Sequence, residues 1–125
     1  MKIDFLNIDL ETYSDADLST CGVYRYVESS SFEILLFGYA INGGKVSVVD
    51  LARGETLPAE VIHALLDPSV TKYAFNASFE RICLSRWLAS HYPHLFNGYG
   101  SAEDTTASYL DPVSWKCTMI WCAYL

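Results

Sequence analysis

The sequence predicts an α/β domain, in which helices flank a mixed β-sheet. Strand-like apolar runs fill the first half of the chain, an Asn/Gly connection joins two of them, and two amphipathic helical patterns follow. The chain has 125 residues, which is the size of one domain. Its composition is 51% hydrophobic and only 18% charged, which excludes a disordered chain. We therefore expect one domain over residues 1–125.

The first expected element is a strand over residues 3–10. Leu6, Ile8 and Leu10 fall on one face of this strand, as in a strand with one buried side. Asn7 and Asp9 fall on the other face, and Glu11 continues that alternation. The segment 12–31 contains Gly22 and several Ser and Asp residues without a sustained period, so we expect an irregular loop there.

Two further strands are expected immediately after that loop. They are "FEILLFGYAI" (32–41) and "KVSVVDL" (45–51). The residues between them, Asn42-Gly43-Gly44, are of the kind that closes a β-hairpin. Three strands in succession are therefore predicted.

The second half of the chain alternates helices with a strand. Pro58 suits a first helical turn, a stripe of apolar residues follows it, and Pro68 ends the helix. The run "VTKYAF" (70–75) predicts a fourth strand. Asn76 then caps a helix from about Ala77 to about Ala89.

The last third of the chain is expected to be a long loop and a final helix. Pro, Gly and Asn residues interrupt the segment 91–112, and "WKCTMIWCAYL" (115–125) has helical spacing. The complete order is β-β-β-α-β-α-loop-α. That final helix has no closing cap, so we expect the natural protein to continue. It also leaves an apolar surface on which we expect self-association. The residues of that surface are Met119, Ile120, Trp121 and Leu125.

Charge and hydropathy limit the partners. The net charge is −7 and the pI about 4.7, which argues against a simple electrostatic interface with nucleic acid but not against a metal-dependent nuclease. No apolar run approaches the roughly 20 residues that span a bilayer. Asp4 and Asp9 interrupt the apolar stretch that a signal peptide would need. We expect a soluble, cytoplasmic protein without a membrane partner.

Asp9 and Glu11 form the first candidate site. Positions i and i+2 of a strand face the same way, so the two carboxylates project about 7 Å apart. Like charges at this distance destabilise each other unless a cation or strong donors lie between them, and a divalent metal is the simplest such partner. The alternative is that the strand simply emerges into solvent at Asp9.

Glu80 is the second candidate. It lies in the first turn of the helix that Asn76 caps, at the end of an apolar stripe with Cys83 and Trp87. From there a carboxylate could reach a metal held over the end of the first strand. The alternative is that the helix dipole alone favours an acid at this position.

These two elements together resemble a known family. "IDLET" (8–12) followed by "FNASFE" (75–80) resembles the first two signature motifs of the ribonuclease H-like 3′→5′ exonucleases with four catalytic acids. The wider run, including "TYSDADLSTCGVYRY" (12–26) and "WKCTMIWCAYL" (115–125), is similar to the N-terminal exonuclease region of phage-type family A DNA polymerases. The resemblance implies a ribonuclease H-like sheet, C-terminally incomplete here, within a longer polymerase polypeptide.

The resemblance also implies roles for single residues. Asp9 would bridge two divalent ions, Mg²⁺ or Mn²⁺, Glu11 would bind the ion that carries the attacking water, and Glu80 would hold the other where the family usually has aspartate. The reaction implied is proofreading hydrolysis at a single-stranded DNA 3′ end. Four residues would contact that end, namely Leu10, Thr12, Asn76 and Phe79.

The third motif of the family, a tyrosine or histidine shortly before a last aspartate, has no good match. Tyr99 with Glu103 has the spacing but the wrong acid, and Asp104 and Asp111 are equally poor candidates. We therefore expect this chain alone to bind metal weakly and to have little or no activity. The alternatives are a non-catalytic ribonuclease H-like module for structure or assembly, and an RNA exonuclease of the oligoribonuclease type.

Overall fold

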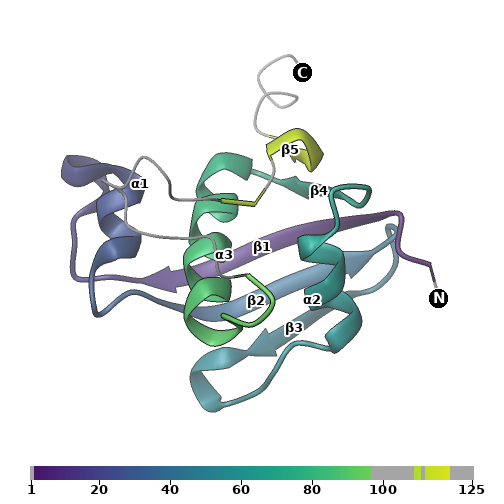
Figure 1. Ribbon diagram of the computed structural model, residues 1–125, viewed down its shortest axis with the longest axis horizontal. Coiled ribbons are helices and arrows are strands. Elements are labelled where there is room, and N and C mark those ends of the chain that lie inside the picture. Colours follow the sequence, from purple (N-terminus) through teal and green to yellow (C-terminus); the bar gives the residue numbers. More distant parts are fainter. Residues whose placement is uncertain (1, 97–108, 111, 119–125) are drawn as a thin grey trace.

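The computed structural model describes residues 2–96, 109–110 and 112–118, apart from the side chains of residues 19–21. In this part of the chain, five strands form one sheet in the order β3-β2-β1-β4-β5 (Figure 1). The strands are β1 (Phe5–Tyr13), β2 (Glu33–Ile41), β3 (Val46–Asp50), β4 (Thr71–Ala74) and β5 (Trp115–Cys117). The helices are α1 (Leu18–Glu28), α2 (Ala59–Leu66) and α3 (Ala77–His91), with 3-10 turns η1 (Leu51–Arg53) and η2 (Pro112–Ser114).

The sheet is mixed, as predicted. β1 pairs with β2, and β2 with β3, in antiparallel fashion, whereas β1 with β4 and β4 with β5 are parallel. This α/β arrangement is compatible with a ribonuclease H-like fold. The predicted fold class is therefore confirmed, with the two corrections described below.

One face of the sheet carries the core, and α2 and α3 lie over that face (Figure 1). Leu6, Ile8 and Leu10 all point into this core, which confirms the alternation predicted for β1. On the opposite face, Val46 and Val48 of the edge strand β3 are exposed. On β1 itself, the predicted site residues Asp9 and Glu11 lie on the exposed face, whereas Leu10 lies on the core face.

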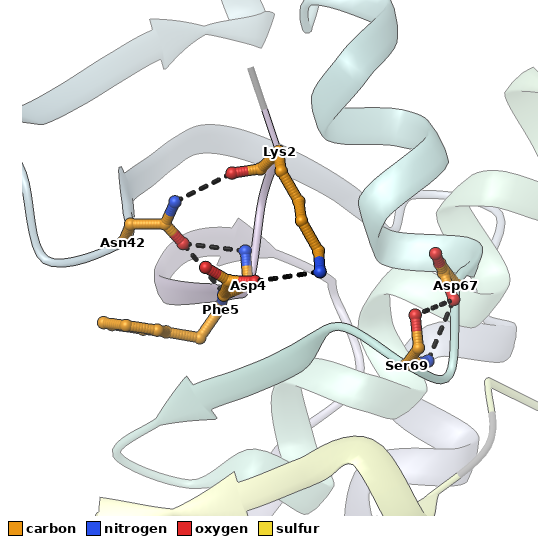
Figure 2. Close-up of polar contacts among 6 residues, drawn as sticks. All are labelled: Lys2, Asp4, Phe5, Asn42, Asp67 and Ser69. Atoms are coloured by element: carbon orange, nitrogen blue, oxygen red, sulfur yellow. Dashed lines mark hydrogen bonds and ion pairs between the residues drawn. The ribbon is translucent and has the colours of Figure 1, made fainter.

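The predicted hairpin between β2 and β3 is confirmed. Asn42 and Gly43 have φ values of 52° and 74°, as the two central residues of a type I′ turn require. The Asn42 side chain also forms hydrogen bonds to the backbone of the N-terminal segment (Figure 2). Its Oδ1 accepts hydrogen bonds from the backbone N–H groups of Asp4 (2.8 Å) and Phe5 (3.1 Å), and its Nδ2 donates to the Lys2 carbonyl (2.9 Å).

The first correction concerns residues 12–31, where the expected loop is wrong. β1 continues to Tyr13, and α1 then occupies Leu18–Glu28 before β2 begins. Gly22, with φ 78° and ψ 169°, is not helical and kinks α1. The helix is stabilised by tertiary packing, because Tyr26 and Val27 are buried and α1 contacts α3.

The second correction concerns the expected helix over 115–125. Residues Trp115–Cys117 instead form β5, which pairs with β4 and extends the sheet. This strand is determined by a partner about 40 residues away, which helical spacing within the segment cannot reveal. Residues 119–125, and with them the expected self-association surface, lie outside the described residues.

The remaining elements agree with the prediction. Pro58 is the N-cap of α2, and the helix ends at Leu66, before Pro68. Asn76 caps α3, with its Oδ1 accepting from the Phe79 N–H at 3.3 Å. Residues 97–108 of the expected long loop are not among the described residues. Within the part that is described, no helix is long and apolar enough to cross a membrane.

Buried Lys72 joins the parallel half of the sheet to α2. Its Nζ donates to the carbonyl oxygen of Asp67, at the end of α2, and to Ser114 Oγ, just before β5, at 2.6 and 3.3 Å. The Asp67 carboxylate accepts from the N–H and the hydroxyl of Ser69 (Figure 2), and these bonds hold the pKa of Asp67 below its usual value. Lys72 therefore holds together three segments that are separate in the sequence.

Candidate functional site

The site is positioned by the unequal lengths of two neighbouring parallel strands. Only residues 5–7 of β1 pair with β4, which ends at Ala74, whereas β1 runs on to Tyr13. After the end of β4 the chain enters α3. The first turn of α3 therefore lies beside the part of β1 that continues beyond its pairing with β4. Asp9 and Glu11 both follow the last β1 residue that pairs with β4.

The two acids of β1 lie as the sequence predicted, on the face away from the core. Both are exposed, and their partners in β2 are Gly38 for Asp9 and Leu36 for Glu11. A Cβ atom at Gly38 would lie 3.8 Å from the Asp9 Cβ, so the absence of a side chain there leaves space beside this carboxylate. The register then shifts between Glu11 and Thr12. A register shift of the β-bulge type bends a strand and re-aims its side chains, and β-bulges are common next to functional sites.

Glu80 is the buried acid of the site. It lies in the first turn of α3 and is only 6% exposed. Its Oε2 atom is buried and has no hydrogen-bond partner within the described part of the chain. A buried, unpaired carboxylate oxygen is costly, because ionisation there lacks both water and a donor.

Burial is the main cause that raises the pKa of Glu80 to about 7, and the negative charge of Asp9 adds to it. Hydrogen bonding to the backbone at Glu80 and Asn76 acts in the opposite direction. The effect of Asp9 means that the two carboxylates lie within electrostatic range, although they come from β1 and α3. Burial, with the Glu80 charge as a lesser cause, also raises the pKa of the Cys83 thiol one helical turn further on, so this thiol is inert.

A divalent cation fits this arrangement. A hard cation accepts carboxylate oxygens, and it would supply both the partner that Glu80 Oε2 lacks and the charge that offsets the repulsion from Asp9. Among the described residues, however, no group of three or more Asp, Glu, His or Cys side chains lies close enough to hold an ion. The structure thus places Asp9 and Glu80 within electrostatic range of each other, and Glu11 lies two residues after Asp9 on the same face of β1. Tyr99, Glu103, Asp104 and Asp111, the poor matches to the third motif, are outside the described residues.

Two of the predicted substrate-binding residues are linked by a residue that sequence reasoning missed. The hydroxyl of Tyr26, on α1, is hydrogen-bonded to Thr12 Oγ1 at 3.0 Å. The ring of Tyr26 packs against that of Phe79, with centroids 5.9 Å apart. The spacing of Val23, Tyr26 and Val27, at i, i+3 and i+4, was the available signal for a helix with Tyr26 on its buried face.

The substrate-binding roles of all four residues stay predictions, and the structure describes the surroundings of the other two, Leu10 and Asn76. Leu10 belongs to the hydrophobic core, so its side chain points away from Asp9. Asn76 uses its side-chain oxygen to cap α3. Phe75, immediately before it, follows the last residue of β4 and is exposed, so it offers a flat aromatic surface.

Together, these features define an α/β protein whose candidate site is a pair of carboxylates, one exposed on the central strand of a mixed sheet and one buried at the start of a helix. Over 115 residues the chain is 43% identical to the DNA polymerase of Bacillus phage SP02. That alignment covers 92% of this chain but 15% of the phage protein, so the chain spans only a small part of this relative. No family model matches the chain.

Proposed function

We propose that this chain is part of the exonuclease region of a phage-type DNA polymerase, and that the longer protein uses this region to hydrolyse phosphodiester bonds at single-stranded DNA 3′ ends with the help of divalent cations. The observation that carries the proposal is the buried, unpartnered Oε2 of Glu80 beside Asp9. The similarity to a phage DNA polymerase along almost the whole chain supports the same assignment. We place the protein in the cytoplasm of a phage-infected or lysogenic cell.

Asp9, Glu11 and Glu80 would hold two Mg²⁺ or Mn²⁺ ions. When bound, such ions supply Lewis acidity that makes water a better nucleophile and stabilises a leaving oxygen. The side chains themselves provide the negative charge that concentrates the ions at one place. The hydrogen bond to Tyr26 would hold Thr12 in place for contact with the terminal nucleotide, and the exposed ring of Phe75 would stack on a base.

The first test measures metal binding to the 125-residue chain by Mn²⁺ titration with electron paramagnetic resonance. We expect weak binding that Asp9→Asn and Glu80→Gln each reduce at least about tenfold, since each removes a charged ligand. The matched control is Asp4→Asn, which removes an exposed acid where β1 begins. Equal Mn²⁺ affinity in all four proteins would overturn the assignment of the site.

The second test measures degradation of 5′-labelled single-stranded DNA with Mn²⁺, by this chain and by the longest open reading frame that contains it. We expect shortening from the 3′ end by the longer protein, its loss in Asp9→Asn, and little or no activity of the 125-residue chain. Single-stranded RNA of the same sequence serves as the comparison for an oligoribonuclease. Activity that survives Asp9→Asn would contradict the proposal.

A second candidate function is a non-catalytic module for structure or assembly. It is favoured by one observation, namely that the described residues bring no three potential ligands together. Loss of polymerase assembly or stability in the absence of this segment, without any nuclease activity in either protein, would favour it.

A further inference from the structure

A second potential ligand site lies on the other side of the first turn of α3. It is an open cleft of about 500 Å³ between that turn and β5. Its lining residues are Ala77, Ser78, Arg81, Pro112, Trp115, Lys116 and Cys117. This volume is within the range of small-molecule pockets. None of these residues is a predicted site residue, so the cleft needs an explanation of its own.

The cleft is a direct neighbour of the carboxylate pair. Successive helix residues point about 100° apart, so one turn can present Glu80 toward β1 and Arg81 toward β5. The Arg81 guanidinium donates one hydrogen bond to the Leu110 carbonyl at 3.0 Å, which fixes its position at the edge of the cleft. A chain of nucleotides bound at Asp9 and Glu80 could therefore continue into the cleft around this single turn.

The polar groups of the cleft favour an anion. The chain has only eight Lys and Arg residues and a net charge of −7, yet two of the eight, Arg81 and Lys116, line this cleft and no described acid does. The first backbone N–H groups of α3, at Ala77 and Ser78, have no acceptor within their own helix and carry the positive end of its dipole. The N–H of Phe79 is already used by the Asn76 cap.

The walls of the cleft are apolar and contain one unsatisfied donor. Trp115 and Pro112 lie on the β5 side, opposite Ala77. Trp115 is 7% exposed, and its indole Nε1 is buried without a hydrogen-bond partner in the described part of the chain. Apolar walls with a few convergent polar groups are typical of sites for small organic ligands, and a buried indole N–H normally has an acceptor.

We propose that this cleft binds one nucleotide unit of a single strand, the neighbour of the unit whose phosphate lies at Asp9 and Glu80. Arg81, Lys116 and the start of α3 hold its phosphate, and Trp115 and Pro112 contact its base or sugar. The proposal rests on the proposed function for the identity of the ligand, but it concerns binding and needs no cleavage. It gives an acidic protein a local cationic contact for DNA.

The test is a binding measurement without catalysis. Fluorescence anisotropy with labelled oligothymidylates of two to six units, in EDTA, compares the wild-type chain with Lys116→Gln and Arg81→Gln. We expect each variant to lower the affinity about threefold to tenfold and to reduce the slope of log K against log salt by about 0.7, as loss of one phosphate contact to a single strand predicts. The matched control is Lys45→Gln, an exposed lysine at the β2–β3 turn, which should change neither quantity.

A second readout locates the ligand. The indole Nε1–H resonance of Trp115, assigned with Trp115→Phe, should shift when a thymidine dinucleotide is added to the wild-type chain. It should shift much less with inorganic phosphate, and the dinucleotide should have little effect on it in Lys116→Gln. Equal effects of phosphate and dinucleotide would overturn the proposal in favour of a simple anion site. Unchanged DNA affinity in both variants, in folded proteins by circular dichroism, would also overturn it.

The test of DNA binding by the cleft can be distinguished from the test of cleavage under the proposed function. Asp9→Asn should abolish cleavage by the longer protein but leave the Lys116-dependent binding in place. DNA binding through the cleft without any cleavage would contradict the proposed function alone. Cleavage that depends on Asp9 but not on Lys116 or Arg81, with unchanged affinity, would contradict the cleft alone.

Discussion

Glu80 has a destabilising position in the metal-free protein. Its carboxyl group is almost fully buried, one oxygen has no partner, and Asp9 lies nearby. Replacing such a group by a neutral one of the same shape normally increases stability. Retaining an acid at this position therefore makes sense if the folded protein gains a ligand there, and the following prediction measures the cost directly.

The stability of the metal-free protein should depend on the protonation of Glu80. Its pKa is raised from 4.5 to about 7, so between these pH values the folded state binds a proton that the unfolded state has released. The stabilising contribution is complete below pH 4.5 and is lost as the pH rises through 7. At about 1.4 kcal/mol for each pKa unit, Glu80→Gln should be more stable than wild type above pH 7 by up to about 3 kcal/mol.

Urea unfolding in EDTA at pH 4.5, 6 and 8 checks this difference, which should be near zero at the lowest pH and largest at the highest. Glu33→Gln is the control, because Glu33 is exposed where β2 begins. A constant difference between Glu80→Gln and wild type at all three pH values would mean that Glu80 is not protonated in the folded state near neutral pH.

Tyr26 should couple β1 to α1 through its hydroxyl. The hydrogen bond to Thr12 is part-buried and 3.0 Å long, and such bonds contribute about 0.5–1.5 kcal/mol. A double-mutant cycle of Tyr26→Phe and Thr12→Val in urea unfolding should give a coupling energy in this range. The pair Tyr24→Phe and Thr12→Val should give none, because Tyr24 contacts the ring of Tyr109 instead. Additive effects in the first pair would exclude the predicted coupling.

At the scale of elements, the β2–β3 hairpin is the most self-contained. Asn42 stabilises this hairpin in two ways. It adopts a positive φ that few residues adopt, and its side chain makes three hydrogen bonds to the N-terminal segment. Two substitutions separate these roles. Asn42→Gly keeps the backbone conformation and loses the bonds, whereas Asn42→Ala loses both.

We expect Asn42→Gly to lower the free energy of unfolding by about 1–2 kcal/mol, since the bonds lie at an exposed edge where water replaces them. Asn42→Ala should cost about 1 kcal/mol more, because alanine in the left-handed region is strained. Thermal or urea unfolding of the two variants and wild type measures both steps. The prediction fails if Asn42→Gly is as stable as wild type.

The elements that the sequence predicted correctly are those with local signals. The Asn42-Gly43 turn, the Pro58 start of α2 and the Asn76 cap of α3 each depend on residues within a few positions of one another. α1 and β5 were missed because their stability comes from distant partners. α1 depends on packing against α3, and β5 depends on pairing with β4.

At the scale of the whole molecule, the sheet has an antiparallel part made from nearly contiguous sequence and a parallel part assembled from distant segments. β5 adds only three residues to β4, so side-chain contacts must help to hold it. Lys72 provides such contacts to Asp67 and Ser114 from a fully buried position. The parallel edge should therefore be the more sensitive of the two parts to mutation.

Lys72→Met should test this difference. It keeps most of the apolar volume and removes the charged donor, so we expect a loss of about 1–3 kcal/mol in the free energy of unfolding. Native-state hydrogen exchange should accelerate more at β4 and β5 than in the β1–β2 pairs. Lys45→Met, an exposed change of the same type, should alter neither. Uniform acceleration over the whole sheet would contradict a local role for Lys72.

The sequence by itself determined which residue types were available and which way they face along each element. The two-residue period of β1 is enough to place Asp9 and Glu11 opposite Leu6, Ile8 and Leu10, because side-chain direction in a strand depends only on position. The cap at Asn76 likewise places an acid in the first turn of α3. Such local rules predicted the candidate acids before any contact was known.

Only the tertiary structure decided that Asp9 and Glu80 lie within electrostatic range. That proximity exists because β4 ends before β1 does, so that α3 begins beside the last residues of β1. The length and pairing of a strand depend on the whole sheet and not on one segment of the sequence. The same holds for the link from Thr12 through Tyr26 to Phe79, and for the cleft between α3 and β5. These features join segments far apart in the chain, whose contacts form only when the whole fold is made.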